Sequence, residues 1–503
     1  MKLTKLILKQ IALSGLLLLI ATGCEDFLSE NNKSALTQDN YYKNASQAQS
    51  AVDGIYVNLR TWTNYLGYGE KPWSSLELLV GHANTNGQSD FNRELIQHDA
   101  GTDHPAFSDV WNNFYNGIAN ANVAIKNIPD VQMDEQLKSK LLGEARFLRA
   151  YFYFNLVRLY GNIPLITEPV DAGSNKLHPE QASVEDVYEQ IVADLKSAEQ
   201  SNLPLVDRTG RASKGAVKAL LSNVYLSMAG YPVEGGDEYY ELAADKAEEV
   251  IDSNQYPLFE NYDYLHDREH QNQKEFIFQV QYESGIAEHQ ITPMIVPENI
   301  GITPYTDEFG ALVPIDEFVE SYEDGDLRTE EQEFYFSEYT MPDGSTVEFG
   351  AHALYKYWLD AAANPQNGDQ HNDLNWTLYR MPEVMLIYAE AINEVNGGPN
   401  QKAYEQINAI RERANLDPLS GLSQQEFRRA VWKERYHELA FENKAYFDIQ
   451  RTHMVYDLVD NEFVNAFDHT NVQGTRFTEQ YMLWPIPQSE MQANSNLKQN
   501  PGW

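Results

Sequence analysis

The chain has 503 residues, with 75 acidic and 37 basic side chains and a formal net charge of −38. A chain this acidic repels nucleic-acid phosphates and anionic lipid surfaces, so both binding classes are excluded. Its 31 Tyr, 21 Phe and 8 Trp exclude a disordered acidic polymer, and its length allows a large hydrophobic core.

The first 23 residues have the order of a secretory signal. Three lysines within the first nine residues precede an apolar run over 11–20. That run is shorter than the roughly 20 residues of a membrane-spanning helix, and it ends in Ala-Thr-Gly directly before Cys24, the single cysteine. We therefore predict a lipoprotein signal peptide over 1–23 and lipidation of Cys24, which would anchor the mature chain. The alternative is a buried free thiol after a short hydrophobic helix.

The clearest helical pattern covers residues 134–159. Its apolar residues at helical spacing on one face include Phe147, Ala150, Tyr151 and Phe154. Gly161 is placed as a C-cap, and Pro164 as the residue that prevents continuation.

Further helical segments are expected in pairs joined by short breakers. Alanine-rich apolar spacing predicts four pairs: 46–60 beside 107–128, 134–159 with 183–197, 213–228 with 239–251, and 382–396 with 400–413. Each pair can bury its apolar face on the next, which predicts a mainly α, tetratricopeptide-like α-α superhelical scaffold. An unrelated helical bundle is the alternative, because no pair matches the repeat consensus residue by residue.

The pattern changes between about 257 and 379. Residues 276–280 read as a short strand, and 341–345 as a hairpin turn, among many prolines and glycines. We expect an irregular, strand- and loop-rich insertion, and such insertions on a rigid scaffold often carry binding sites.

Several motifs recur in one order along the chain and together resemble the SusD/RagB family of nutrient-binding lipoproteins. The most specific is Leu148-Arg149-Ala150-Tyr151, followed by Tyr160-Gly161-Asn162-Ile163-Pro164-Leu165. The other matching segments are 26–28, 51–56, 275–278, 321–328, 379–391, 434–442, 447–451 and 483–487. The segment 443–445 departs from the usual Gly-x-Arg, which concerns a structural motif only.

The resemblance implies an organisation and a function. The signal peptide over 1–23 would be followed by a helical part over 24–256 with three helix pairs. A part over 257–503 would hold the insertion, about 257–379, and the last pair, all in one compact unit. The protein would sit on the cell surface at the outer membrane, where Glu25 and Asp26 resemble the family's surface-sorting tag. It would capture an oligosaccharide or polysaccharide and pass it to a SusC-like TonB-dependent transporter.

No catalytic motif supports an enzyme. Metalloprotease, serine-hydrolase, Walker and dinucleotide-binding signatures are missing from the sequence, so we expect no catalytic residues, no cofactor and no metal. His266 and His270 have a spacing that could share a metal on a helix, but their charged neighbours favour a solvated face. The oxygen-rich segment 367–373 lacks the spacing of a calcium loop and is expected to be a plain surface loop.

Aromatic side chains in loop-like sequence are the candidate ligand site. Sugars stack their C–H faces on aromatic rings, while their hydroxyls bond to neighbouring polar groups. In the family, an early loop and the insertion form such a platform, so the resemblance implies a site that includes Trp73, Trp358, Tyr65, Tyr68 and Tyr305. The alternative is that each ring merely packs a loop onto the helices.

Two other functions remain open at this stage. A peptide-binding member of the same family would use the same scaffold with a pocket for backbone amides or termini. A secreted glycoside hydrolase would cleave the bound glycan, and it would need a catalytic carboxylate pair that so acidic a sequence cannot single out. The charged residues Glu390, Glu434, Arg435, Glu438, Asp448 and Arg451 lie among apolar helix positions, which favours buried ion pairs of the scaffold.

Overall fold

Helices dominate the fold. The computed structural model describes residues 41–63, 72–85, 90–170, 177–303, 308–358 and 372–503. The helices that build the scaffold are α2 (Ala45–Tyr56), α5 (Pro105–Asn127), α6 (Glu135–Tyr160), α7 (Val184–Gln200), α8 (Lys214–Ala229), α9 (Asp237–Asp252), α11 (Met381–Asn396) and α12 (Gln401–Arg413). The other helices are α3 (Pro72–Val80), α4 (Asp90–Gln97), α10 (Asp316–Val319), α13 (Gln424–Glu438), α14 (Ala445–Thr452) and α15 (Gln488–Ala493).

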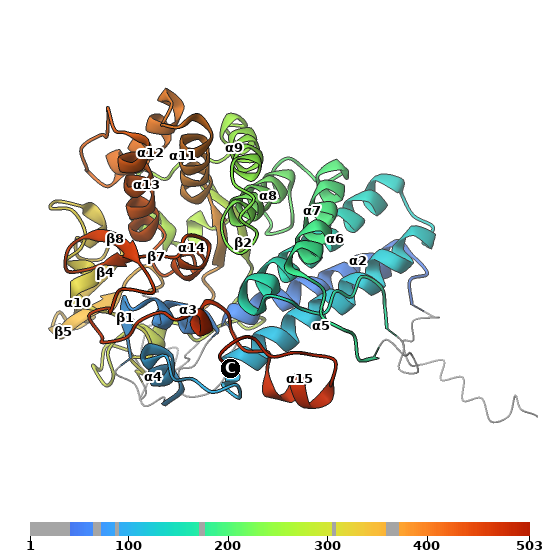
Figure 1. Ribbon diagram of the computed structural model, residues 1–503, viewed down its shortest axis with the longest axis horizontal. Coiled ribbons are helices and arrows are strands. Elements are labelled where there is room, and N and C mark those ends of the chain that lie inside the picture. The colour runs from blue at the N-terminus through green and yellow to red at the C-terminus, as the bar shows by residue number, and fades with distance from the viewer. Residues whose placement is uncertain (1–40, 64–71, 86–89, 171–176, 304–307, 359–371) are drawn as a thin grey trace, which may run out of the picture.

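The scaffold helices form the four predicted pairs. Helix α2 packs on α5, α6 on α7, α8 on α9, and α11 on α12. Successive pairs also contact each other through α5 and α6, α7 and α8, and α9 and α11. The pairs therefore follow one another across the molecule, from α2 and α5 on the right to α12 on the upper left (Figure 1). This arrangement confirms the tetratricopeptide-like scaffold.

The ends of α6 show why this helix begins and stops where it does. The side chain of Asp134 accepts a hydrogen bond from the Leu137 N–H at 2.9 Å, which caps the first turn. At the other end Gly161 adopts a φ of +67°, and its N–H donates to the Val157 carbonyl oxygen at 2.9 Å. The predicted C-cap at Gly161 is thus confirmed, because few residues other than glycine tolerate this backbone.

The strands are short and pair in twos. The antiparallel pairs are β1 (Ala83–Asn84) with β3 (Val313–Pro314), β2 (Phe276–Val280) with β6 (Trp376–Arg380), β4 (Tyr335–Thr340) with β5 (Thr346–Leu354), and β7 (Met454–Asp457) with β8 (Glu462–Asn465). The predicted strand at 276–280 and the turn at 341–345 are both confirmed. Strand β6 lies at the end of the insertion, pairs with β2 near its beginning, and leads directly into α11.

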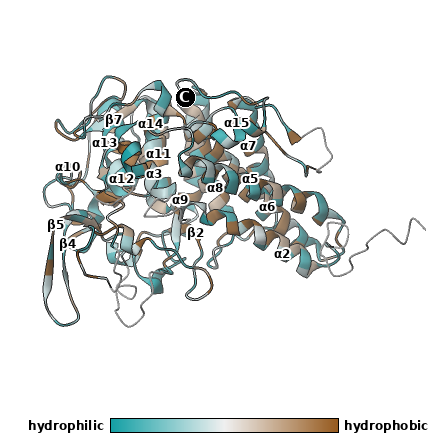
Figure 2. Ribbon diagram, turned by 90° about the horizontal axis from the view of Figure 1, so that it is seen from below, coloured by the Kyte–Doolittle hydropathy of each residue, from teal (hydrophilic) through white to brown (hydrophobic). Residues whose placement is uncertain are grey.

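One large hydrophobic cluster runs through the molecule, with members from Ala48 to Leu497. A small second cluster lies under the β4–β5 hairpin and contains Trp358 and Phe336. Hydrophobic and hydrophilic residues alternate along helices such as α2 and α5, and the β4–β5 hairpin extends away from the helices (Figure 2). Because of this alternation, a long helix can bury its hydrophobic face in the core while its hydrophilic face contacts solvent.

His104 caps α5 in an unusual way and makes stability depend on pH. Its Nδ1 accepts from the Ala106 N–H at 3.2 Å, and its Nε2 lies 3.2 Å from the Phe91 carbonyl oxygen, so the neutral ring with hydrogen on Nε2 fits both. Burial lowers the pKa of the His104 imidazole to about 4. Between about pH 6.5 and 4 the unfolded chain then binds a proton that the folded one does not. Because of this group, the free energy of unfolding is expected to be about 2 kcal/mol lower at pH 5 than at neutral pH.

The variant His104→Asn tests this dependence. Asparagine is a good N-cap without a titrating group, so the difference in unfolding free energy between pH 7.5 and pH 5 should shrink by about 2 kcal/mol. Guanidinium chloride unfolding followed by circular dichroism at both pH values measures it. An unchanged pH difference in the variant would show that His104 is charged in the folded state.

Candidate functional site

Trp73 lies in the core at the start of α3, next to segment 64–71. Its side chain is 0% exposed, and its Nε1–H donates to the Phe441 carbonyl oxygen at 3.1 Å. The ring packs edge-on against Tyr357 and Trp376, with centroids 5.6 and 5.4 Å away. These contacts join residues that are hundreds of positions apart and fix one end of segment 64–71.

Trp358 is buried in the second cluster, next to segment 359–371. It is 2% exposed, and its ring centroid lies 5.2 Å from that of Phe336 and 5.3 Å from that of Tyr339. Ile302 belongs to the same cluster. The residues that border segments 304–307 and 359–371 therefore pack on each other.

These positions correct the expectation that both tryptophans form a solvent-facing platform. Neither ring has a free face on which a sugar could stack, because core partners surround Trp73 and Trp358. Their partners Trp376, Phe441 and Phe336 are not adjacent to them in sequence. The loop-like residues next to each tryptophan therefore gave no sign of these core contacts. Tyr65, Tyr68, Tyr305 and Cys24 lie outside the described residues, and their roles stay predictions.

The borders of segments 86–89 and 304–307 also lie together. Strand β1 pairs with β3, the Thr85 hydroxyl donates to the Gly310 carbonyl oxygen at 3.2 Å, and the Asn92 amide donates to Ala311 at 3.2 Å. With the contacts of Trp73 and Trp358, the described borders of four segments, 64–71, 86–89, 304–307 and 359–371, form one connected region. We call these borders, Pro72–Trp73, Thr85, Ile302–Thr303, Glu308–Gly310 and Tyr357–Trp358, the loop base.

Glu308 organises part of the loop base and was missed by the sequence analysis. Its buried carboxylate accepts the backbone N–H groups of Ile302 and Thr303, both at 2.8 Å, and that of Gly301. A carboxylate that accepts several backbone donors makes strong, charge-assisted hydrogen bonds, so Glu308 holds the backbone of residues 301–303 in place. Nothing in the local pattern distinguished Glu308 from the other acidic residues.

Some rings in the loop base, or in the β4–β5 region next to it, keep part of their surface in solvent. Tyr339, Tyr355, Tyr357 and Phe309 are all partly exposed. The Tyr357 ring is stacked on Trp376, with centroids 4.9 Å apart and planes 18° apart, and its hydroxyl donates to the Phe441 carbonyl oxygen at 2.7 Å. The described part of the site thus offers partly exposed tyrosines on a rigid aromatic support.

A buried ion network lies directly beneath the loop base. Arg380 binds Glu438, Glu442 and Glu275, while Arg413 binds Glu275 and Glu438, both at 2.6 Å. Lys356, between Tyr355 and Tyr357, donates to the Glu438 and Ala440 carbonyl oxygens and pairs with Glu442. Burial lowers the pKa of Lys356 to about 8.

The charged helix residues form ion pairs, as predicted. Arg451 pairs with Glu390 and Asp448, Arg435 with Asp448, and Glu434 with Arg328. They are structural, since each of these guanidinium groups pairs with a carboxylate of the same chain.

The histidine pair does not converge. His266 is buried and faces the carbonyl oxygens of Lys356 and Glu333, so the expected solvated face is wrong for this residue. His270 instead contacts Asp267 at 2.7 Å and stacks on Tyr264. Within the part of the chain that the structure describes, no three or more potential metal ligands gather. Segment 367–373 is mostly outside that part.

None of the helices in the described ranges is both long and apolar enough to cross a membrane.

Comparison with known proteins identifies the class of this fold. Residues 26–226 match a family model described as starch-binding associating with outer membrane, and residues 329–503 match the SusD family model. A SusD superfamily protein from Parabacteroides distasonis is similar in structure with a TM-score of 0.87. It is 35% identical, and the match covers 93% of this chain and all of that one.

Two further relatives extend the comparison. A laminarin binding SusD-like protein is 26% identical over 92% of this chain and all of its own, with a TM-score of 0.75. SusD-like protein P2 of Formosa agariphila is 29% identical over 97% of this chain and 98% of its own length. The chain belongs to the SusD family, which includes glycan-binding proteins.

Proposed function

We propose that this protein captures an oligosaccharide or polysaccharide at the cell surface and does not cleave it. The observation that carries the proposal is the loop base, where the borders of four segments are held together by buried aromatic and carboxylate contacts. A rigid base that presents several loops suits recognition of an extended ligand. Laminarin binding by a relative supports a glycan as that ligand.

The proposal assigns different roles to the aromatic residues. Tyr65, Tyr68 and Tyr305 belong to segments whose described borders form the loop base, and they would stack on sugar rings. Trp73 and Trp358 would be positioning residues, which hold the ends of these segments from within the core. Open platforms of this kind bind weakly, with dissociation constants from roughly micromolar to millimolar.

The proposal also includes the anchor and the partner. Cys24 would carry the lipid after removal of residues 1–23, and the mature chain would form one compact unit on the outer membrane. The bound glycan would pass to a SusC-like TonB-dependent transporter. The family model that describes starch-binding proteins associating with the outer membrane supports this location.

Native affinity electrophoresis against a panel of polysaccharides, including laminarin and starch, tests the capture function. We expect one glycan to retard the protein, and Tyr65→Ala, Tyr68→Ala or Tyr305→Ala to lower the affinity for that glycan by roughly 2- to 10-fold per lost stacking contact. Tyr239→Ala, which removes a partly exposed ring on α9 far along the chain from these segments, is the matched control and should retain full retardation.

Three other outcomes would contradict the proposal. Binding to peptides without retardation by any glycan would indicate a peptide-capturing member of the family. New reducing ends in the glycan after incubation would indicate a glycoside hydrolase. Equal loss of retardation in Tyr239→Ala and the three loop variants would show that the loop tyrosines are not the site.

A further inference from the structure

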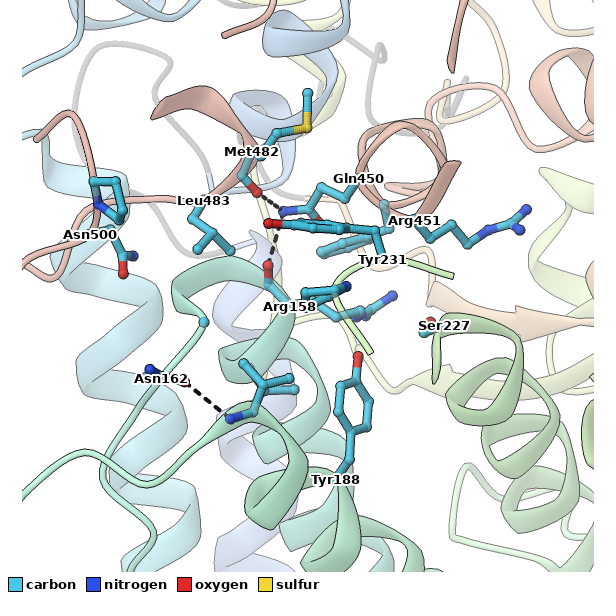
Figure 3. Close-up of a pocket in the computed structure, with 16 residues that line it drawn as sticks. Arg158, Asn162, Tyr188, Ser227, Tyr231, Gln450, Arg451, Met482, Leu483 and Asn500 are labelled. Atoms are coloured by element: carbon cyan, nitrogen blue, oxygen red, sulfur yellow. Dashed lines mark hydrogen bonds between the residues drawn. The ribbon is translucent and has the colours of Figure 1, made fainter. Parts of the chain in front are cut away.

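A cavity of about 190 Å³ opens on the helical scaffold, on different elements from the loop base (Figure 3). It lies between the C-terminal ends of α6 and α8, the first turns of α7, helix α14 and residues near the C-terminus. A protein cavity of about 150 Å³ is large enough for benzene, so this one has room for a single six-membered ring. Its walls are mixed, with apolar Val157, Val184 and Leu483 beside a few polar groups.

Arg158 is the cation of this cavity. Its guanidinium lies between two rings, 3.7 Å from the Phe154 centroid and 3.6 Å from that of Phe447. Its Nε donates to the Phe154 carbonyl oxygen at 3.1 Å and its Nη2 to the Asn155 side chain at 2.8 Å. Among the residues that the structure describes, no carboxylate pairs with Arg158 and Nη1 has no hydrogen-bond partner. Burial lowers the pKa of this guanidinium, which a bound anion would counteract.

The other arginine at the cavity shows the contrast. Arg451 pairs with Glu390 and Asp448, and in Figure 3 its guanidinium points away from Arg158. Carboxylates of the scaffold therefore neutralise Arg451, whereas Arg158 has no ion-pair partner in the described part of the chain and Glu383 acts on it only through space.

Tyr188 supplies a second free donor. Its side chain is 2% exposed, and its hydroxyl has no hydrogen-bond partner in the described ranges. In Figure 3 the hydroxyl points into the cavity, toward Arg158. A hydroxyl that lines a cavity and has no partner among the described residues can donate its hydrogen to a ligand bound there.

We propose that this cavity binds a ring-sized carboxylic acid, whose carboxylate accepts from the Arg158 guanidinium and the Tyr188 hydroxyl. The ring would lie between the apolar walls, and Tyr231, which is 43% exposed, would border the opening. Arginine suits this role, because its planar fork matches a carboxylate. The acid is either a free solute or the terminal acidic sugar of a glycan. This site is independent of the capture of glycans at the loop base.

Isothermal titration of the protein at low ionic strength tests the proposal. The probes are D-galacturonate, D-glucuronate and benzoate, each with its neutral counterpart D-galactose, D-glucose or benzyl alcohol. We expect at least one acid to bind at least roughly tenfold more tightly than its counterpart, since a charged hydrogen bond is lost in the neutral compound. Tetragalacturonate distinguishes the sources: binding as tight as the monomer indicates a glycan end, and binding of monomers alone indicates a free solute.

Two variants and a matched control locate the site. Tyr188→Phe removes only the hydroxyl and should weaken binding roughly 3- to 10-fold, while Arg158→Gln should weaken it roughly 10- to 100-fold. Tyr225→Phe on α8 removes a buried hydroxyl that has no hydrogen-bond partner among the described residues and lies outside the cavity, and this variant should bind as the wild type does.

Three results would overturn the proposal. The first is the absence of binding by all three acids at millimolar concentration. The second is equal affinity for acids and neutral counterparts. The third is the same affinity in Tyr188→Phe as in Tyr225→Phe, a comparison that does not depend on whether Arg158→Gln folds.

Discussion

Replacing Glu438 by glutamine is expected to lower the free energy of unfolding by about 3–5 kcal/mol. Its carboxylate is 0% exposed and lies within the reach of three guanidinium groups, those of Arg328, Arg380 and Arg413. Burial alone raises the pKa of Glu438, but these cations outweigh burial and hold the pKa below its ordinary value. The amide keeps the shape of the side chain but leaves the buried cations without their shared counter-charge.

Urea unfolding of Glu438→Gln beside Glu412→Gln measures this effect. Glu412 is exposed on the neighbouring helix α12, so its substitution should change the free energy by less than about 0.5 kcal/mol. If both variants unfold alike, the network contributes little, and Glu275 and Glu442 suffice to neutralise the arginines. A loss of stability in Glu438→Gln but not in Glu412→Gln would show that the shared carboxylate of Glu438 stabilises the network beneath the loop base.

Trp73→Ala is expected to destabilise the protein by about 3–5 kcal/mol and to abolish retention by the glycan that the wild type binds. The substitution empties a core position between Tyr357 and Trp376 and removes the hydrogen bond to the Phe441 carbonyl oxygen. Binding is lost because the end of segment 64–71 is no longer held, although the ring itself does not touch the ligand.

Unfolding and affinity electrophoresis on the same preparation separate the two roles of Trp73. Trp432→Ala on α13, which removes a partly exposed tryptophan elsewhere, should leave glycan retention intact. Wild-type stability together with lost retention in Trp73→Ala would contradict the positioning role and restore Trp73 as a stacking residue.

The helical scaffold could be predicted because its signals are local. The spacing of Phe147 and Phe154 and the glycine at 161 are visible within one helix, and the structure places α6 within a residue of the expected bounds. The pairing of helices also followed from sequence order, because neighbouring segments with short connections pack together. Strand β6 was missed, since its partner β2 lies about a hundred residues earlier in the chain.

The candidate site was less predictable, because exposure is not a local property. Trp73 and Trp358 stand beside glycine- and asparagine-containing segments that suggest surface loops, yet each meets core partners supplied by distant parts of the chain. Glu308 is one acid among 75 and gains its role only from the turn that folds around it. The sequence did not single out Arg158 and Tyr188 either. Both lie in helices among apolar residues, and such positions normally indicate packing in the core.

The Phe441 carbonyl oxygen accepts hydrogen bonds from both Trp73 and Tyr357. Trp73 lies just after segment 64–71, and Tyr357 lies just before segment 359–371. One acceptor thereby ties together the described borders of two segments, 64–71 and 359–371, that lie almost three hundred residues apart in the chain. The acceptor itself belongs to neither segment, so substitutions within 64–71 or 359–371 are expected to leave this shared anchor in place. A change of ligand preference is therefore expected to need changes within these segments and none in the helices that carry Phe441's neighbours.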